Sequence, residues 1–205
     1  MTGRRVRRPT LFSLWRKVRR ENSAASRLLG STSLRFALHG WQRMWIARLY
    51  RCYEPNTCII SNGFASMGIG VPGAMAAKLA NPDKRVMTIT GDAGFMMNSQ
   101  EIETALRWNI AMVIMIWNDS EYGLIKWHQQ RHFGRTGHIS FNNPDFVRYA
   151  ESFGARGYRV TSADGLRPTL ERAFDDNTVV IVDVAVDYSE NMKLTEKLGK
   201  LVCPI

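Results

Sequence analysis

The sequence contains little cysteine and no long apolar run. Three of its 205 residues are cysteine, and Cys52, Cys58 and Cys203 lack the close paired spacing of a zinc site. An odd set of cysteines also argues against a disulfide framework, so a reducing compartment fits best and we expect a cytoplasmic protein. No stretch reaches about eighteen apolar residues and no segment repeats at a fixed period, which excludes transmembrane and solenoid classes and predicts no contact with a membrane.

Acidic residues are almost absent from the first 40 positions. This segment holds ten of the 28 Lys and Arg but one of the 18 Asp and Glu, so it carries +9 of the net charge of +10. It could be an organelle transit peptide, a basic arm for nucleic acid or anionic lipid, a leader from a disrupted or truncated reading frame, or a tail without a role. We favour the third over the first, interpret 1–40 as a disordered basic leader and 41–205 as one domain, and expect no nucleic-acid partner.

From about residue 44 onward, short apolar runs alternate with amphipathic segments. This order predicts an α/β fold, a three-layer, doubly wound and mostly parallel sheet. Strands are expected over 57–60, 85–90, 111–117, 157–160 and 179–184. Helices are expected over 44–50, from the glycine-rich turn at 61 to about 80, and over 99–108, 122–128, 145–152 and 166–174.

Two of the predicted strands end in an acidic residue. Asp92 follows the strand at 85–90, and Asp119 follows the next strand 27 positions later. If these strands are neighbours, both carboxylates face the edge where open α/β sheets bind ligands. Two carboxylates can hold Mg²⁺ together with substrate phosphates, and the small Ala93 and Gly94 allow close approach of backbone N–H groups to an anion. The pair therefore predicts a site for a metal and a phosphate ligand.

Other motifs have simpler interpretations. Residues 68–73 (GIGVPG) match the dinucleotide-binding pattern, but seven residues separate them from the preceding strand, so we interpret the glycines as packing positions. His128 and His132 lie four apart without the glutamate of a zinc motif, which favours a solvated or capping role. Trp117 and Trp127 are more typical of packing than of a substrate pocket. Core filling is expected for most of the methionines at 67, 87, 96, 97, 112 and 115.

The segment GDAGFMMNSQEIETALRWNIAMVIMIWND resembles the diphosphate-binding signature of thiamine-diphosphate enzymes. Together with SNGFASMGIGVPGAMAAKL, WNDSEYGLIKWHQQ, YAESFGA and VDVAVDYSENMKL, it is similar to the C-terminal, cofactor-binding third of the acetolactate synthase family. The resemblance covers about 44–198. It implies thiamine diphosphate and Mg²⁺ as cofactors, with FAD bound only in a complete assembly.

The resemblance also implies roles for single residues. Asp92, Asp119 and the backbone carbonyl of Glu121 would bind Mg²⁺. The diphosphate would be bound by Gly91, Ala93, Gly94 and Asn118. Ala93 stands where the family usually has glycine, and Asp119 where asparagine is commoner.

Two further residues would act on the organic part of the cofactor. Met67 would hold it in a bent conformation, and the carbonyl of Ala65 would contact the aminopyrimidine. The bend brings the amino group to the thiazolium carbon, so these residues act by positioning.

The implied reaction is decarboxylation of pyruvate and transfer of the two-carbon unit to a 2-oxo acid, as in branched-chain amino acid or acetoin pathways. In the family, a glutamate from a pyrimidine-binding domain activates the cofactor across a dimer interface. We therefore expect the chain to be incomplete alone, and to form a homodimer or associate with such a domain. The alternative is the small subunit of a split thiamine-diphosphate decarboxylase, or a non-catalytic module that binds magnesium and thiamine diphosphate.

Overall fold

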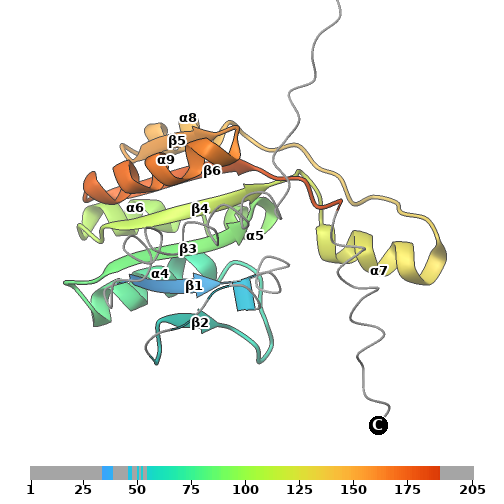
Figure 1. The fold of residues 1–205 in the computed structure, drawn as a ribbon, viewed down its shortest axis with the longest axis horizontal. Coiled ribbons are helices and arrows are strands. Elements are labelled where there is room, and N and C mark those ends of the chain that lie inside the picture. The colour runs from blue at the N-terminus through green and yellow to red at the C-terminus, as the bar shows by residue number, and fades with distance from the viewer. Residues whose placement is uncertain (1–33, 39–45, 48–49, 51, 53–54, 190–205) are drawn as a thin grey trace, which may run out of the picture.

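The computed structural model describes residues 34–38, 46–47, 50, 52 and 55–189, with backbone alone for 34–38 (Figure 1). Residues 1–33 of the expected leader, most of the helix expected at 44–50, and Cys203 lie outside the described residues. The described residues form one six-stranded sheet in the order β2-β1-β3-β4-β6-β5, and every strand pair is parallel. The strands are β1 Leu34–Leu38, β2 Cys58–Ile60, β3 Arg85–Gly91, β4 Met112–Asn118, β5 Arg156–Val160 and β6 Val179–Ala185.

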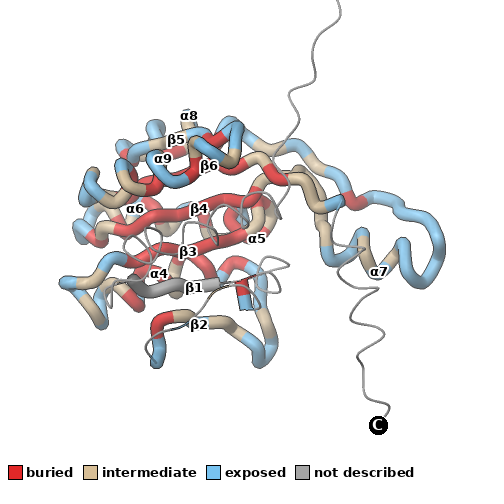
Figure 2. The backbone as a smooth tube through the Cα atoms, viewed as in Figure 1, coloured by how far each residue is buried: buried red, intermediate tan, exposed pale blue. Residues whose placement is uncertain are grey.

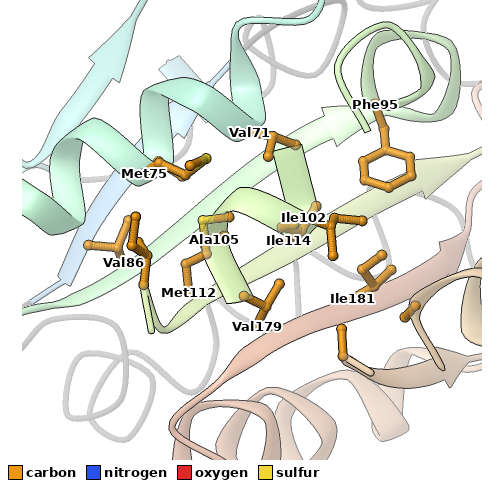
Figure 3. Packing of buried hydrophobic residues seen from close by; sticks show 14 of the residues in the cluster. Val71, Met75, Val86, Phe95, Ile102, Ala105, Met112, Ile114, Val179 and Ile181 are labelled. Atoms are coloured by element: carbon orange, nitrogen blue, oxygen red, sulfur yellow. The ribbon is translucent and has the colours of Figure 1, made fainter. Parts of the chain in front are cut away.

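Helices cover both faces of the sheet. The described helices are α4 Gly70–Ala80, α5 Asp92–Met96, α6 Glu101–Arg107, α7 Gly123–Phe133, α8 Phe146–Ser152 and α9 Ala163–Asp175, of which all but α7 pack on the sheet. Apolar side chains of α4, α5, α6 and α8 pack on one face, against Ile114 and Ile181 among others (Figure 3). Those of α9 and the segment at Ile46 pack on the other. The three-layer, doubly wound α/β class is thereby confirmed.

The central strands owe their position to their composition. Six of the seven residues of β4 and of β6 are buried, and both strands are rich in β-branched residues (Figure 2). A strand that is apolar on both faces is stable only where helices cover both sides. α7 differs, since none of its residues is buried and it extends away from the sheet (Figures 1 and 2). No described helix is long and apolar enough to cross a membrane.

Three elements differ from the sequence-based expectation. β1 lies inside the segment interpreted as a leader and pairs with β2 and β3, so the sheet begins before the boundary placed at residue 41. Its five residues were hidden by the basic composition averaged over 1–40. α5 replaces an expected turn, and α7 continues to Phe133 before Gly134 ends it in the left-handed conformation (φ 65°).

Candidate functional site

The carboxyl ends of three adjacent strands meet at one edge of the sheet. Gly91 of β3 is opposite Trp117 of β4, and Asn118 of β4 is opposite Ala185 of β6. Parallel pairing therefore brings together the loops that follow β3 and β4. Asp92 and Asp119 are the first residues after these two strands, as the strand pattern predicts.

Asp92 is 2% exposed and is the first residue of α5. Its Oδ2 accepts hydrogen bonds from the backbone N of Ser120 at 2.7 Å and from Nδ2 of Asn143 at 2.7 Å. Its Oδ1 accepts from the backbone N of Ala93 at 2.8 Å. Burial raises the pKa of Asp92 above its ordinary value, although these hydrogen bonds oppose the rise.

Asp119 is partly buried beside Asp92. Burial and, second, the charge of Asp92 raise the pKa of Asp119 to about 7. The backbone N–H of Glu121 donates a long hydrogen bond, 3.4 Å, to Oδ1 of Asp119. The ammonium group of Lys126 forms an ion pair with the side-chain carboxylate of Glu121 at 2.5 Å. The charge of Asp92 therefore opposes ionisation of Asp119, and a divalent cation would relieve this repulsion.

The donor set fits Mg²⁺ bound together with a phosphate ligand. Among the described residues no cluster of three or more His, Cys, Asp or Glu could hold a metal ion. Mg²⁺ needs fewer protein ligands than that, since one or two carboxylates commonly suffice when phosphate oxygens complete its shell. The carbonyl oxygen of Glu121 accepts one hydrogen bond, from the N–H of Gly123 at 3.0 Å, and keeps a second lone pair.

Asn118 and Asn143 form a network at the same edge. Nδ2 of Asn118 donates to Oδ1 of Asp183 in β6 at 3.0 Å, and Oδ1 of Asn118 accepts from Nδ2 of Asn143 at 3.1 Å. Asp183 is 5% exposed and also accepts from Nε of Arg159 at 3.1 Å. The predicted diphosphate ligand Asn118 is therefore already bound on both sides by protein.

The backbone at α5 is closely packed. A Cβ at Gly94 would lie 3.0 Å from Oγ1 of Thr90, so this position favours glycine. The N–H of Ala93 donates to the side chain of Asp92 and would have to leave it to bind a diphosphate. Gly91 ends β3 with an extended backbone and directly precedes Asp92.

A turn over 61–69 lies beside the segment that follows α5. Nδ2 of Asn98 donates to the carbonyl of Gly68 at 3.2 Å, and Gly68 has a φ of +91°. Met67 is 41% exposed in this turn, and Ala65 has a φ of 50°, which is unusual for an L-residue. Asn98 thus joins the turn that carries Met67 to the segment that follows α5.

The rival motifs have structural roles. Gly70 and Gly73 belong to α4, whereas a dinucleotide-binding turn would directly follow its strand. A Cβ at Gly70 would lie 3.0 Å from Oγ1 of Thr88, so this glycine allows close packing. Trp117 is 4% exposed in the core. Trp127 lies under Arg131 on α7.

The remaining candidates divide between surface and core. His128 and His132 are exposed on α7 with parallel rings 6.1 Å apart. Of the methionines expected in the core, those at 87, 112 and 115 are buried, and those at 67, 96 and 97 are at least 40% exposed. The expectation of core filling is therefore wrong for Met96 and Met97, which lie at the C-terminal end of α5, beyond the carboxyl end of β3, and are not covered by other described elements.

Comparison with known proteins agrees with this geometry. A parallel sheet that carries two acidic residues at its carboxyl edge, where open α/β sheets bind ligands, defines the class of α/β proteins to which this fold belongs. Residues 39–184 match the family model of the C-terminal TPP binding domain of thiamine pyrophosphate enzymes, and the chain belongs to this family.

Several curated relatives carry a more specific description. The chain is 42% identical to acetolactate synthase of Bacillus subtilis over 162 residues, which cover 78% of the chain and 28% of the relative. It is 38% identical over 155 residues to the catabolic acetolactate synthase of Raoultella terrigena, covering 76% and 28%. It is 34% identical over 164 residues to a probable acetolactate synthase large subunit of Methanocaldococcus jannaschii, covering 79% and 28%. The chain therefore spans less than a third of the length of these relatives.

Sequence reasoning did not find three residues of this edge. Asp183 could have been recognised from the sequence, because it is the one charged residue in the otherwise apolar strand VVIVDVA. Asn143 lies in a polar stretch that is typical of any loop, and nothing in its surroundings marks it. Arg159 alternates with apolar residues in β5 as an ordinary solvent-facing residue would.

Proposed function

We propose that the chain is the cofactor-binding domain of an acetolactate-synthase-like enzyme, which decarboxylates pyruvate and adds the two-carbon unit to a second 2-oxo acid. The observation that carries the proposal is the meeting of Asp92 and Asp119 at the carboxyl ends of β3 and β4. The identity to acetolactate synthases over more than 70% of the chain supports the choice of reaction.

Each site residue has a task in this proposal. Asp92, Asp119 and the carbonyl of Glu121 hold Mg²⁺, and the N–H groups of Ala93 and Gly94 contact the diphosphate. Asn118 can join them if its amide exchanges Asp183 for the ligand. When bound, thiamine diphosphate would supply the nucleophilic carbon for the 2-oxo acid and a cationic ring that serves as the electron sink for decarboxylation.

The turn over 61–69 serves the other end of the cofactor. Met67 would support the bent conformation, and the carbonyl of Ala65, whose backbone is left-handed, would contact the aminopyrimidine. Both tasks are positioning, which lowers the barrier by holding reacting atoms close together. Met67 is exposed in this structure and so is accessible to a ligand.

A pyrimidine-binding domain would complete the site by supplying the activating glutamate, and the chain would have to associate with that domain to be active. Exposed apolar side chains surround the turn and favour such an association, namely Phe64, Met67, Ile69, Met96 and Met97. FAD would bind in the complete assembly, and we place the protein in the cytoplasm. The alternative of a split decarboxylase subunit, or of a non-catalytic module, is decided by turnover after a pyrimidine-binding domain is added.

Calorimetry with Mg²⁺ and thiamine diphosphate tests the proposal. Asp92→Ala should abolish binding, because one of two hard-oxygen ligands is lost beside the diphosphate charge. Asp83→Ala is the matched control, since it removes the same charge from an exposed turn before β3, at the opposite edge of the sheet. Equal affinities of wild type and Asp92→Ala would refute the assignment.

The reaction itself needs a second assay. Acetolactate is measured from pyruvate with the chain alone and after addition of a separately expressed pyrimidine-binding domain. The proposal predicts turnover after the addition and little before it, because a carboxylate hydrogen-bonded to the pyrimidine must accept the proton. Substantial turnover by the chain alone would contradict the need for that domain, and none in either case would favour the non-catalytic alternative.

A further inference from the structure

Asn143 connects the two loops of the candidate site. Its Nδ2 lies 2.7 Å from Oδ2 of Asp92, 3.1 Å from Oδ1 of Asn118 and 3.2 Å from Oγ of Ser120. These acceptors belong to the ends of β3 and β4, whereas Asn143 precedes α8. A residue from a third segment therefore joins the two strand ends.

The chemistry of the contacts fixes the orientation of the Asn143 amide. Reversing it would place a carbonyl oxygen against the carboxylate of Asp92, where two acceptors would repel. In the observed orientation, Oδ1 of Asn143 is buried and has no hydrogen-bond partner among the described residues. An unpaired buried carbonyl costs free energy, so the position serves something other than the stability of the metal-free fold.

The backbone of Ser120, which contacts Asn143, is also constrained. Its φ is 61°, a left-handed conformation that is strained for an L-residue. Its N–H donates to Asp92, and its hydroxyl contacts Asn143. The contacts to Asp92 and Asn143 hold the strained backbone in place directly after Asp119.

The far side of the network is anchored by charge. Asn118 is fixed by Asp183, whose second oxygen accepts from Arg159, and Arg159 also pairs with Asp145 at 2.6 Å. Asp145 caps the N-terminus of α8 and accepts from the backbone N of Val147 at 3.0 Å. Asn143 is thus tied to the sheet directly through Asn118 and indirectly through α8.

We propose that Asn143 is a positioning residue that clamps the ends of β3 and β4, holding Asp92, Asn118 and Ser120 in the arrangement that receives Mg²⁺. The inference rests on the proposed function for its metal. Outer-shell partners of this kind alter metal affinity without ligating the metal.

The test uses the full chain with Asn143→Ala and Asn143→Leu. Leucine has a similar volume and no polar atom, so it preserves packing and removes the clamp. Asn142→Ala is the matched control, because Asn142 is the exposed neighbour in the same segment. Two quantities are measured: hydrogen exchange of the Ser120 amide in the metal-free chain, and the Mg²⁺ concentration that half-saturates binding of thiamine diphosphate.

Both Asn143 variants should exchange the Ser120 amide faster than wild type and need about tenfold more Mg²⁺. Thiamine diphosphate binding at saturating Mg²⁺ should be retained. If Asn143→Leu behaves like wild type in both measurements, Asn143 is a packing residue and the proposal is wrong. If the wild type binds no thiamine diphosphate with Mg²⁺, the proposed function fails together with the metal part of this inference, whereas the exchange of Ser120 still decides whether the clamp exists.

Discussion

Replacing Arg159 by alanine should destabilise the chain, because the nearly buried carboxylate of Asp183 would lose its cationic partner. The side chain of Asp183 is 7% exposed, and its Oδ2 accepts from Nε of Arg159 at 3.1 Å. In Arg159→Ala the carboxylate would keep its hydrogen bond from Asn118 but lose the only cation that the described residues direct at it by an ion pair. The unfolded chain would solvate the same carboxylate fully, so the variant penalises the folded state alone.

The expected magnitude lies between two limits. Exposed ion pairs contribute up to about 1 kcal/mol, and breaking a fully buried pair by removing one partner costs about 3–5 kcal/mol. Arg159 is 45% exposed and Asp183 nearly buried, so solvent screens the pair in part. We therefore expect Arg159→Ala to lower the free energy of unfolding by about 2 kcal/mol.

Urea unfolding at pH 7 measures this loss. Arg156→Ala is the control, an exposed arginine on the same strand, which should change stability by less than about 0.5 kcal/mol. In Arg159→Ala combined with Asp183→Asn, the orphaned charge is removed and at least half of the stability should return. The reasoning is refuted if the double variant is no more stable than Arg159→Ala, or if Arg159→Ala matches the control.

Two further predictions concern the site. Met67→Ala should slow proton exchange at the thiazolium carbon more than it weakens cofactor binding, because the diphosphate anchor is unaffected. Hydrogen–deuterium exchange at that carbon, in a complex with the pyrimidine-binding domain, measures the exchange rate. Weaker binding with an unchanged exchange rate would show that Met67 has only a packing role. The metal-free chain should lose stability as pH rises from about 4 to about 7, because the pKa of Asp119 is about 7 in the folded state and 3.8 for an unperturbed aspartate, so the folded state binds the extra proton. Each pKa unit corresponds to about 1.4 kcal/mol, so the loss of stability is at most about 4 kcal/mol. The loss should be smaller in Asp119→Asn. Thermal melting of both chains across this pH range measures the difference, and identical pH profiles would contradict the assignment of the loss to Asp119.

The sequence could predict those parts of the fold that depend on local pattern. Buried parallel strands are apolar on both faces, so β3, β4 and β6 were recognisable, and acids at their ends predicted the edge at which Asp92 and Asp119 meet. The family assignment followed from several motifs in combination and is confirmed by the match over 39–184. The assigned roles of the site residues stay predictions.

Other features depend on contacts between distant segments. β1 is stabilised by pairing on both sides, which no local pattern in a basic segment reveals. Asn143 is important because the path of the chain after α7 returns it to Asp92, 51 positions away in sequence. The N–H of Ala93 was expected to be available to a diphosphate, but in this structure it donates to Asp92, a local alternative that a carboxylate at the start of a helix offers.

The most direct measurement of the central claim is a crystal structure of the chain with thiamine diphosphate and Mn²⁺ in place of Mg²⁺. The anomalous signal of manganese locates the metal without reference to the proposed ligands. Our account predicts one peak between the carboxylates of Asp92 and Asp119, with diphosphate oxygens completing the shell and the backbone of Gly94 close to the diphosphate. A cofactor bound at another part of the sheet, or a metal that contacts neither carboxylate, would contradict it.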